Sequence, residues 1–159
     1  MILVLLGTQN NSFHRLLDEL EECFEQEIIQ DHVIVQCGHT RFTSKYMELI
    51  DFIPVDQFDE LISQADLVIT HGGVGSIINS IKIGKKVIAV PRLNQYNEHV
   101  NNHQVQIIKT FDEKGFIKGV FNIQDLPETL ATINDFIPTP YTSNNEKMLQ
   151  IISDYIDNN

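Results

Sequence analysis

A glycine-rich segment near the middle of the chain has the residue types of an anion-binding turn. It reads Thr70-His71-Gly72-Gly73-Val74-Gly75-Ser76 and follows a short apolar run. Glycines let backbone N–H groups approach a ligand without a Cβ in the way. A helix that begins near Ser76 would direct the positive end of its dipole at the same place. This pattern favours a diphosphate ligand, and a plain strand-to-helix turn is the alternative.

Two further polar segments follow apolar runs and carry groups that suit phosphate or hydroxyl binding. The first contains Gly7, Thr8 and Gln9, just before a helical pattern, and the second runs from Pro91 to Gln104. In an open parallel sheet, ligands bind beyond the carboxyl ends of the strands. We therefore expect these two segments and the glycine-rich segment to form one site.

The third segment also raises the question of a metal, because His99 and His103 lie four residues apart. A zincin pair needs a glutamate directly after the first histidine, but Val100 stands there, and no third ligand is evident. We expect no metal ion. Hydrogen bonding to a sugar or a ribose is the favoured role of these histidines, and two surface histidines without a role are the alternative.

Other nucleotide-binding and catalytic motifs do not match the sequence. A dinucleotide-binding fingerprint reads G-x-G-x-x-G. The first apolar run is followed by a single glycine, Gly7, and the sequence that starts at Gly73 lacks the third glycine of this motif. Gly84-Lys85-Lys86 has no glycine five residues earlier, as a P-loop requires. The chain contains no G-x-S-x-G, and neither cysteine stands beside an obvious histidine, so a hydrolase with a serine or cysteine nucleophile is disfavoured.

Charge and composition exclude two broad classes of protein. The 159 residues include 22 Asp and Glu against 11 Lys and Arg, a net charge of -11, so the chain lacks the charge of a nucleic-acid binder. The longest apolar run, 1–6, is far shorter than a membrane span, and no basic residues precede it as in a signal peptide. Cys23 and Cys37 suit two reduced, buried thiols. We expect a cytoplasmic globular protein.

The hydrophobic pattern predicts alternating strands and helices. Strands are expected over 2–6, 32–36, 52–55, 67–70, 87–90 and 115–117, and helices over 13–24 with Ser12 as the cap, 57–64, 76–83, after Asn97 with Val100, Ile107, Ile108 and Phe111 on one face, and 125–133. This order predicts an α/β fold, a Rossmann-like open, mostly parallel sheet with helices on both faces.

The end of the chain is expected to be a separate unit. We divide the protein into a Rossmann-like domain, 1–137, and a proline-containing connector with a terminal amphipathic helix, 138–159. The capping-box pattern Ser143-Asn144-Asn145-Glu146 marks the start of this helix. Its apolar stripe either packs back on the domain or binds a partner.

The loop segments together carry a family resemblance. In chain order, 70–76, 84–92 and 97–104 resemble the C-terminal, donor-binding half of family 28 glycosyltransferases. The start of the chain, from Gly7-Thr8-Gln9 to Arg15-Leu16-Leu17, and 141–146 are similar to PssE-type subunits of capsule and exopolysaccharide synthesis. The chain is also similar in type to the soluble subunit of the split dolichol-linked N-acetylglucosamine transferase. Nearly the whole sequence is covered.

This resemblance implies half of a GT-B enzyme, in which 1–137 is the nucleotide-sugar-binding domain. The partner would be a membrane-associated acceptor-binding subunit that recruits this cytoplasmic chain to the inner face of the membrane. The implied reaction is inverting transfer of a hexose, with galactose as the best candidate, from a UDP-sugar to an undecaprenyl-diphosphate-linked sugar acceptor. No cofactor is implied besides the donor substrate. A noncatalytic nucleotide-sugar-binding or partner-stabilising subunit is the alternative, and the isolated chain is a candidate homo-oligomer.

The resemblance also assigns residues to the donor. Gly7 and Thr8 match a first phosphate-facing loop, Gly72 to Ser76 match a second, and Asn79 replaces a ribose-binding glutamate for which Glu98 could compensate. Val55 lies near the expected uracil contact. The expected donor-binding residues are Gly7, Thr8, Gln9, Gly72, Gly73, Gly75, Ser76, Asn79, Glu98, His103 and Gln104. The general base usually belongs to the other half, so Glu98 and His99 are only weak catalytic candidates.

Overall fold

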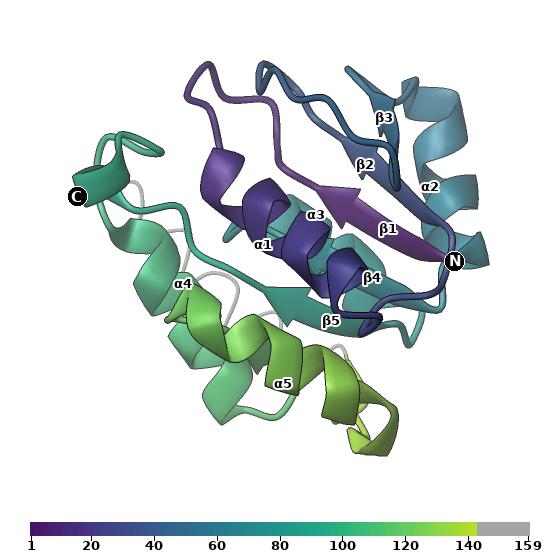
Figure 1. Cartoon of the computed structure of the whole chain (residues 1–159). Helices are drawn as coiled ribbons and strands as arrows, with labels where there is room; N and C mark the ends of the chain where they lie inside the picture. The colour runs from purple at the N-terminus through teal and green to yellow at the C-terminus, as the bar shows by residue number, and fades with distance from the viewer. Residues whose placement is uncertain (143–159) are drawn as a thin grey trace.

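The computed structural model describes residues 1–142, which form one parallel sheet in the order β3-β2-β1-β4-β5-β6 (Figure 1). The strands are β1 (Ile2–Leu5), β2 (Val33–Gln36), β3 (Glu48–Ile50), β4 (Leu67–Thr70), β5 (Lys86–Ala89) and β6 (Lys118–Gly119). β1 lies in the interior, where Leu3 pairs with Ile34 of β2 on one side and with Val68 of β4 on the other. The predicted fold class is confirmed.

Five α-helices of the described chain connect and cover the strands. They are α1 (His14–Glu25), α2 (Val55–Gln64), α3 (Val74–Ile81), α4 (His103–Glu113) and α5 (Leu126–Thr132), with 3-10 turns η1 (Asn94–Tyr96), η2 (Ile123–Asp125) and η3 (Ile133–Asp135). Helices α1 and α5 contribute to the core on one face of the sheet, and α2, α3 and α4 to the core on the other. Figure 1 shows α1 and α5 in front of the strands.

The apolar runs of the strands are continuous because both faces of the sheet are covered. In β1, Val4 belongs to the core beneath α1, whereas Leu3 and Leu5 belong to the core beneath α2, α3 and α4. The same alternation holds in β4, where Val68 and Ile69 point to opposite cores. Both cysteines are buried, with unpaired thiols.

Two predicted elements in the first half of the chain are wrong. The strand predicted at 52–55 does not form, because Pro54 occupies the N-cap of α2 and the real edge strand, β3, lies earlier and has the mixed sequence Glu-Leu-Ile. Ser12 does not cap α1. Phe13 stands at the cap position without a side-chain cap, and its N–H donates instead to Oγ1 of the distant Thr40, at 3.0 Å.

Other predicted boundaries shift at the ends of elements. Helix α3 begins at Val74 and ends at Ile81, two residues earlier at each end than predicted. Helix α4 begins only at His103, so Val100 lies in the preceding loop, 79% exposed, and is not part of a buried helix face. The last strand is 118–119, since the buried residues 116 and 117 only lead into it.

The connector predicted from 138 onward contacts the main body where it is described. The Thr139 N–H donates to the Gly115 carbonyl at 2.9 Å, and the Tyr141 ring lies 6.3 Å from that of Phe116. The predicted terminal helix from Ser143 lies outside the described residues, and the division after 137 stays a prediction.

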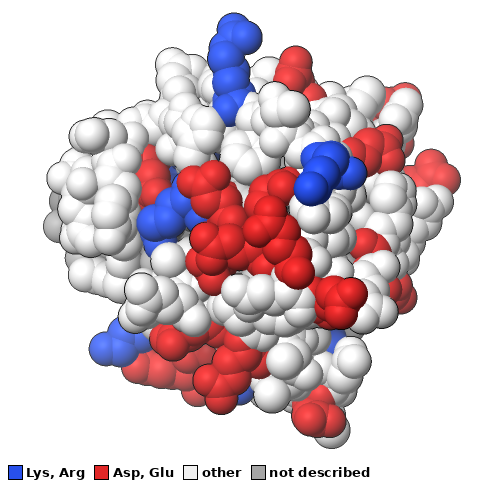
Figure 2. Space-filling model, in the orientation of Figure 1, with Lys and Arg blue, Asp and Glu red and all other residues white. Residues whose placement is uncertain are grey.

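The face of the molecule that α1 covers is acidic. Figure 2 shows a group of red side chains in the middle of this face, and α1 carries Asp18, Glu19, Glu21, Glu22 and Glu25. Within 1–142, no helix has both the length and the apolar composition needed to cross a bilayer. The same residues contain no cluster of three or more potential metal-ligating side chains.

Burial predicts a sharp contrast between two isoleucines. Ile69 is 0% exposed in the central sheet, whereas Ile137 is 88% exposed. Ile69→Ala should lower the free energy of unfolding by about 2–5 kcal/mol, because it leaves a cavity. The matched Ile137→Ala should change it by no more than about 0.5 kcal/mol. Urea denaturation of the purified chain measures both, and similar losses would contradict this core assignment.

Candidate functional site

The carboxyl ends of β1 and β4 meet at the point where the strand order reverses. From β1 the chain winds outward through β2 and β3, then returns to place β4 on the other side of β1. In open α/β sheets, ligands bind in the crevice that such a reversal leaves. Gly7 lies just beyond β1, and His71 directly follows β4. The sheet therefore brings the first two predicted loops together.

Both loops pack against the ring of His71. A Cβ on Gly7 would lie 2.5 Å from His71 Nε2, and one on Gly73 would lie 2.5 Å from Cε1. Gly7 also has a φ of +83°, which L side chains rarely adopt. Only glycine fits at these two positions while the ring stays in place.

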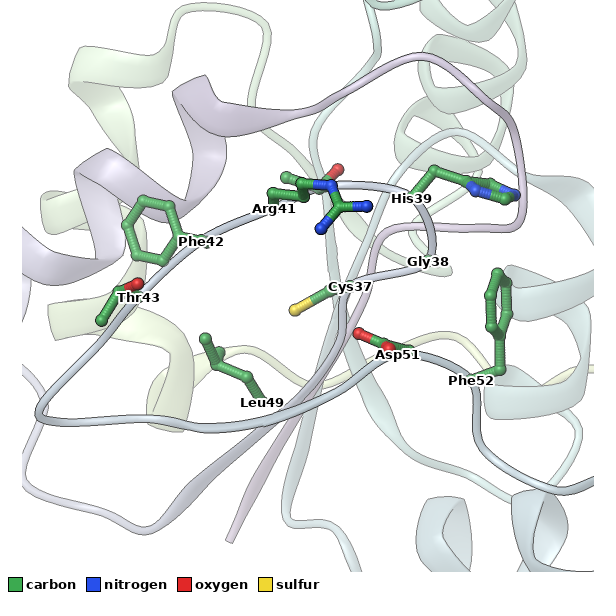
Figure 3. Close-up of a pocket in the computed structure, with 10 residues that line it drawn as sticks. Cys37, Gly38, His39, Arg41, Phe42, Thr43, Leu49, Asp51 and Phe52 are labelled. Atoms are coloured by element: carbon green, nitrogen blue, oxygen red, sulfur yellow. The ribbon is translucent and has the colours of Figure 1, made fainter.

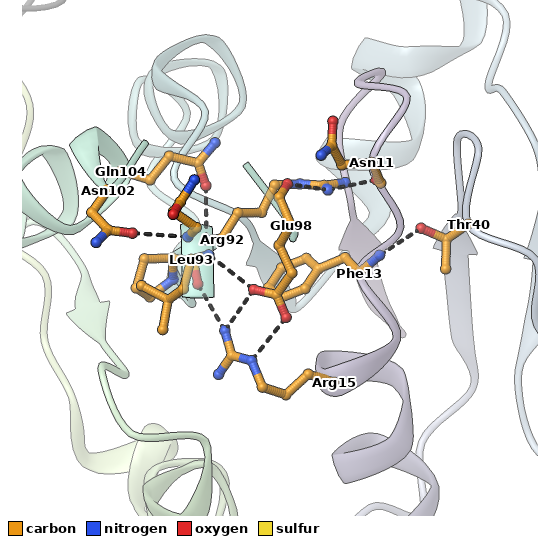
Figure 4. Close-up of polar contacts among 11 residues, drawn as sticks. Asn11, Phe13, Arg15, Thr40, Arg92, Leu93, Glu98, Asn102 and Gln104 are labelled. Atoms are coloured by element: carbon orange, nitrogen blue, oxygen red, sulfur yellow. Dashed lines mark hydrogen bonds and ion pairs between the residues drawn. The ribbon is translucent and has the colours of Figure 1, made fainter. Parts of the chain in front are cut away.

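The side chain of Gln104 joins three parts of the site, and Figure 4 shows its contact with Arg92. Its Oε1 accepts hydrogen bonds from the backbone N–H groups of Gly72, at 3.0 Å, and Arg92, at 2.9 Å. Its Nε2 lies 3.0 Å from Nδ1 of His71. This buried amide therefore fixes the loop after β4 relative to the loop after β5.

Arg92 connects the loop after β5 to the loop after β1. Its guanidinium donates to the carbonyls of Leu6, Asn11 and Glu98 at 2.5, 2.7 and 3.0 Å. It also lies over the Phe13 ring, 5.0 Å from its centroid. Burial lowers the pKa of Arg92 to about 10, so it keeps its positive charge near pH 7.

Glu98 is committed to an ion pair inside the protein. Its carboxylate accepts from Arg15 Nε at 2.9 Å, from a second Arg15 nitrogen at 3.0 Å and from the Leu93 N–H at 2.9 Å. The residue is buried, and the pair joins α1 to the loop after β5. All three of these contacts are with protein groups.

Helix α3 presents its amino end beside the two glycine loops. Gly73 stands at its N-cap, and none of the described side chains caps this end. An uncapped helix N-terminus offers backbone N–H donors and a positive dipole to an anion. Ser76 and Asn79 lie one turn apart on this helix, and Asn79 is exposed.

The histidine pair does not form the predicted helical face. His99 precedes α4, while His103 is its first residue. His99 instead lies 3.0 Å through Nε2 from the side-chain nitrogen of Gln9, which links the first and third loops. Burial and the nearby Arg92 lower the pKa of His99. Thr8 is exposed beside Gln9.

A cavity of about 700 Å³ opens beyond the ends of β2 and β3 (Figure 3). It borders the first loop, since a Cβ on Gly38 would lie 2.5 Å from the Gly7 carbonyl oxygen. Its volume falls in the range of small-molecule sites. The lining residues are Cys37, Gly38, His39, Thr40, Arg41, Phe42, Thr43, Leu49, Asp51 and Phe52.

The predicted donor residues therefore divide into two groups. Gly7, Gly73 and Ser76 lie at the crevice, with Thr8, Gln9, Gly72, Gly75 and Asn79 on the same loops and helix, whereas His103 begins α4. Glu98 and Gln104 are buried, and protein groups occupy their side chains. Sequence reasoning did not assign His71 or Arg92 to the site. Their positions directly after strands were the available signal, but their contacts depend on tertiary packing.

The buried His71 predicts a pH-dependent stability. Burial and the charge of Arg92 lower its pKa to about 3, whereas a histidine in the unfolded chain has a pKa near 6.5. Only the unfolded chain gains this proton as the pH falls from about 6.5 towards 3, so stability decreases over that interval. From pH 7 to pH 5 this group should cost about 2 kcal/mol.

Urea denaturation at both pH values checks this expectation against His71→Asn, which keeps an acceptor for Gln104 but no titrating ring. The variant should lose less stability between pH 7 and pH 5 than the wild type. An equal loss in both proteins would show that His71 is not the buried neutral group described above.

Comparison with known proteins identifies the family. The sequence model of the glycosyltransferase family 28 C-terminal domain matches residues 1–158. The subunit named UDP-N-acetylglucosamine transferase subunit ALG13 is 31% identical in Mus musculus, over 72% of this chain and 10% of that protein. Its counterpart in Kluyveromyces lactis is 31% identical, over 69% of this chain and 49% of that protein. The chain thus spans about half or less of these relatives.

Solved structures share the fold. An NMR solution structure of ALG13 superimposes with a TM-score of 0.61 at 20% identity, over 95% of this chain and 94% of that one. MurG of Acinetobacter baumannii gives a TM-score of 0.55 at 18% identity, over 83% of this chain and 40% of that one. With the family match over nearly its whole length, the chain belongs to the glycosyltransferase family 28 C-terminal domain family.

Proposed function

We propose that this chain is the donor-binding subunit of a two-subunit glycosyltransferase that uses a UDP-sugar. One observation carries the proposal: two glycine loops and the uncapped N-terminus of α3 converge where the strand order reverses. Backbone N–H groups at such a place suit a diphosphate. The family membership makes a nucleotide sugar the expected source of that diphosphate.

The leaving group sets what the site must do chemically. In the proposed inverting transfer, an acceptor hydroxyl attacks the anomeric carbon while UDP departs from the opposite side. The negative charge that develops on UDP is stabilised by the α3 dipole and the N–H groups of Gly73 to Ser76. The buried positive charge of Arg92, behind the first loop, adds to this field.

We assign the nucleoside to the cavity beyond β2 and β3. This cavity adjoins the first glycine loop and includes Phe52, which is 46% exposed and offers an aromatic face. We assign the uracil to the neighbourhood of Asp51 and Phe52. Val55, named above as a neighbour of the uracil contact, begins α2 and is 92% exposed.

The general base is assigned to the partner subunit. The Glu98 carboxylate is engaged by Arg15 and Leu93, and His99 is bonded to Gln9. The relatives are named as subunits of a transferase, which favours a partner for this chain as well. That partner would hold a lipid-linked acceptor at the membrane.

The proposal also concerns which sugar is transferred. The likeness to capsule-type subunits favours UDP-galactose with an undecaprenyl-diphosphate-linked acceptor. The names of the curated relatives favour UDP-N-acetylglucosamine instead. A noncatalytic role, in which the chain binds the nucleotide sugar or only stabilises its partner, is the alternative and predicts that transfer by the assembled pair does not depend on the donor site of this chain.

Calorimetric titration of the purified chain tests the donor site. UDP should bind to the wild type, and Gly73→Val should weaken UDP binding at least about tenfold, because its side chain would displace the His71 ring. Ile83→Ala, at an exposed residue just beyond the same helix, is the matched control and should bind UDP as the wild type does.

The same titration with UDP-galactose, UDP-N-acetylglucosamine and UDP-glucuronate ranks the donor sugars. Equal UDP affinity in Gly73→Val and the wild type would place the nucleotide elsewhere. A titration with NAD tests for a dinucleotide site instead. Tight NAD binding without UDP binding would contradict the proposal.

A further inference from the structure

The orientation of the Gln104 amide follows from its partners. Two backbone N–H groups, of Gly72 and Arg92, point at one end of this side chain, at 3.0 and 2.9 Å. A backbone N–H can only donate, so the atom that receives both must be the carbonyl oxygen. The other end is therefore the NH2 group, and it lies against Nδ1 of His71.

This orientation determines which ring nitrogen of His71 carries the proton. The NH2 group of Gln104 can only donate, so Nδ1 of His71 must accept and has no proton. A neutral ring then carries its proton on Nε2. Burial at 7% exposure and the positive Arg92 nearby both disfavour a second proton.

The protonated nitrogen faces the crevice. Of the ring atoms nearest to Gly7, Nε2 is the closest to where a Cβ would lie, at 2.5 Å, and it is 2.6 Å from the corresponding point at Gly73. Nδ1 is farther from Gly73, at 3.4 Å, and turns toward Gln104. The ring therefore presents an N–H donor between the two glycine loops.

We propose that Gln104 is a positioning residue, which acts on the donor through His71 and not by direct contact with the sugar. Its amide fixes the His71 proton on Nε2 and holds that N–H toward the diphosphate between Gly7 and Gly73. The position of the diphosphate rests on the proposed function. The control of the His71 tautomer rests only on the contacts of Gln104.

Gln104→Glu isolates this role because it changes one atom of the network. A carboxylate can still accept from the Gly72 and Arg92 N–H groups, but it presents an acceptor to His71 Nδ1. The proton should then move to Nδ1, which leaves Nε2 without a hydrogen to donate. Gln106→Glu is the matched control, since it adds the same charge at an exposed position of α4.

Nitrogen-15 NMR of the histidine rings gives the direct measurement. Wild type and Gln106→Glu should show His71 with its proton on Nε2, and Gln104→Glu should show a proton on Nδ1. UDP affinity should fall at least about tenfold in Gln104→Glu and stay unchanged in Gln106→Glu. A purely structural role would lower the melting temperature without moving the proton.

A wild-type His71 with its proton on Nδ1 would overturn the proposal, and this result needs no variant to fold. An unchanged tautomer in a folded Gln104→Glu would also overturn it. So would a moved proton with unchanged UDP affinity, because His71 would then not face the diphosphate. If the wild type binds no UDP, the proposed function fails, and the NMR measurement still decides whether Gln104 controls His71.

Discussion

The hydrogen bonds of one buried amide hold the site in shape. The Gln104 oxygen receives an N–H from the end of β4 and another from the end of β5, and its nitrogen orients the ring of His71. That ring in turn separates the backbones of Gly7 and Gly73. The loops beyond three strands thus share one fixed arrangement, and a ligand finds its donors already in place.

Charge inside the fold supports the same arrangement. The Arg92 guanidinium is buried, and within 1–142 it has no carboxylate partner; it donates instead to backbone carbonyls of two loops. Burying a positive charge is costly unless hydrogen bonds or an anion compensate for it. Glu98 supplies a nearby negative charge, but Arg15 and Leu93 engage its carboxylate. The surface, by contrast, is strongly acidic over α1 (Figure 2).

The sequence predicted what local pattern and chain order control. Continuous apolar runs such as 67–70 mark buried parallel strands, and loops after strands mark the edge of the sheet where a ligand binds. The prediction failed where contacts between residues distant in the sequence determine the local structure. Thr40 accepts the Phe13 N–H at the start of α1 across 27 residues, and the edge strand β3 is only three residues long, too short to show a periodic pattern.

The same limit applies to the site. The glycine loops could be predicted because glycine permits backbone conformations and close approaches that other residues do not. Nothing local shows that Glu98 and Gln104 point inward, since polar residues near a ligand loop usually face the ligand. Only the packed structure shows that their partners are Arg15 for one and His71 for the other.

The most direct test of the account is to record backbone amide NMR shifts of the full chain while UDP is added. The account predicts the largest changes at 7–9, 37–39 and 72–76, the segments around the point where the strand order reverses. Changes concentrated at the opposite end of the sheet, around Asp31, Asp66 and Lys86, or no changes at all, would contradict it.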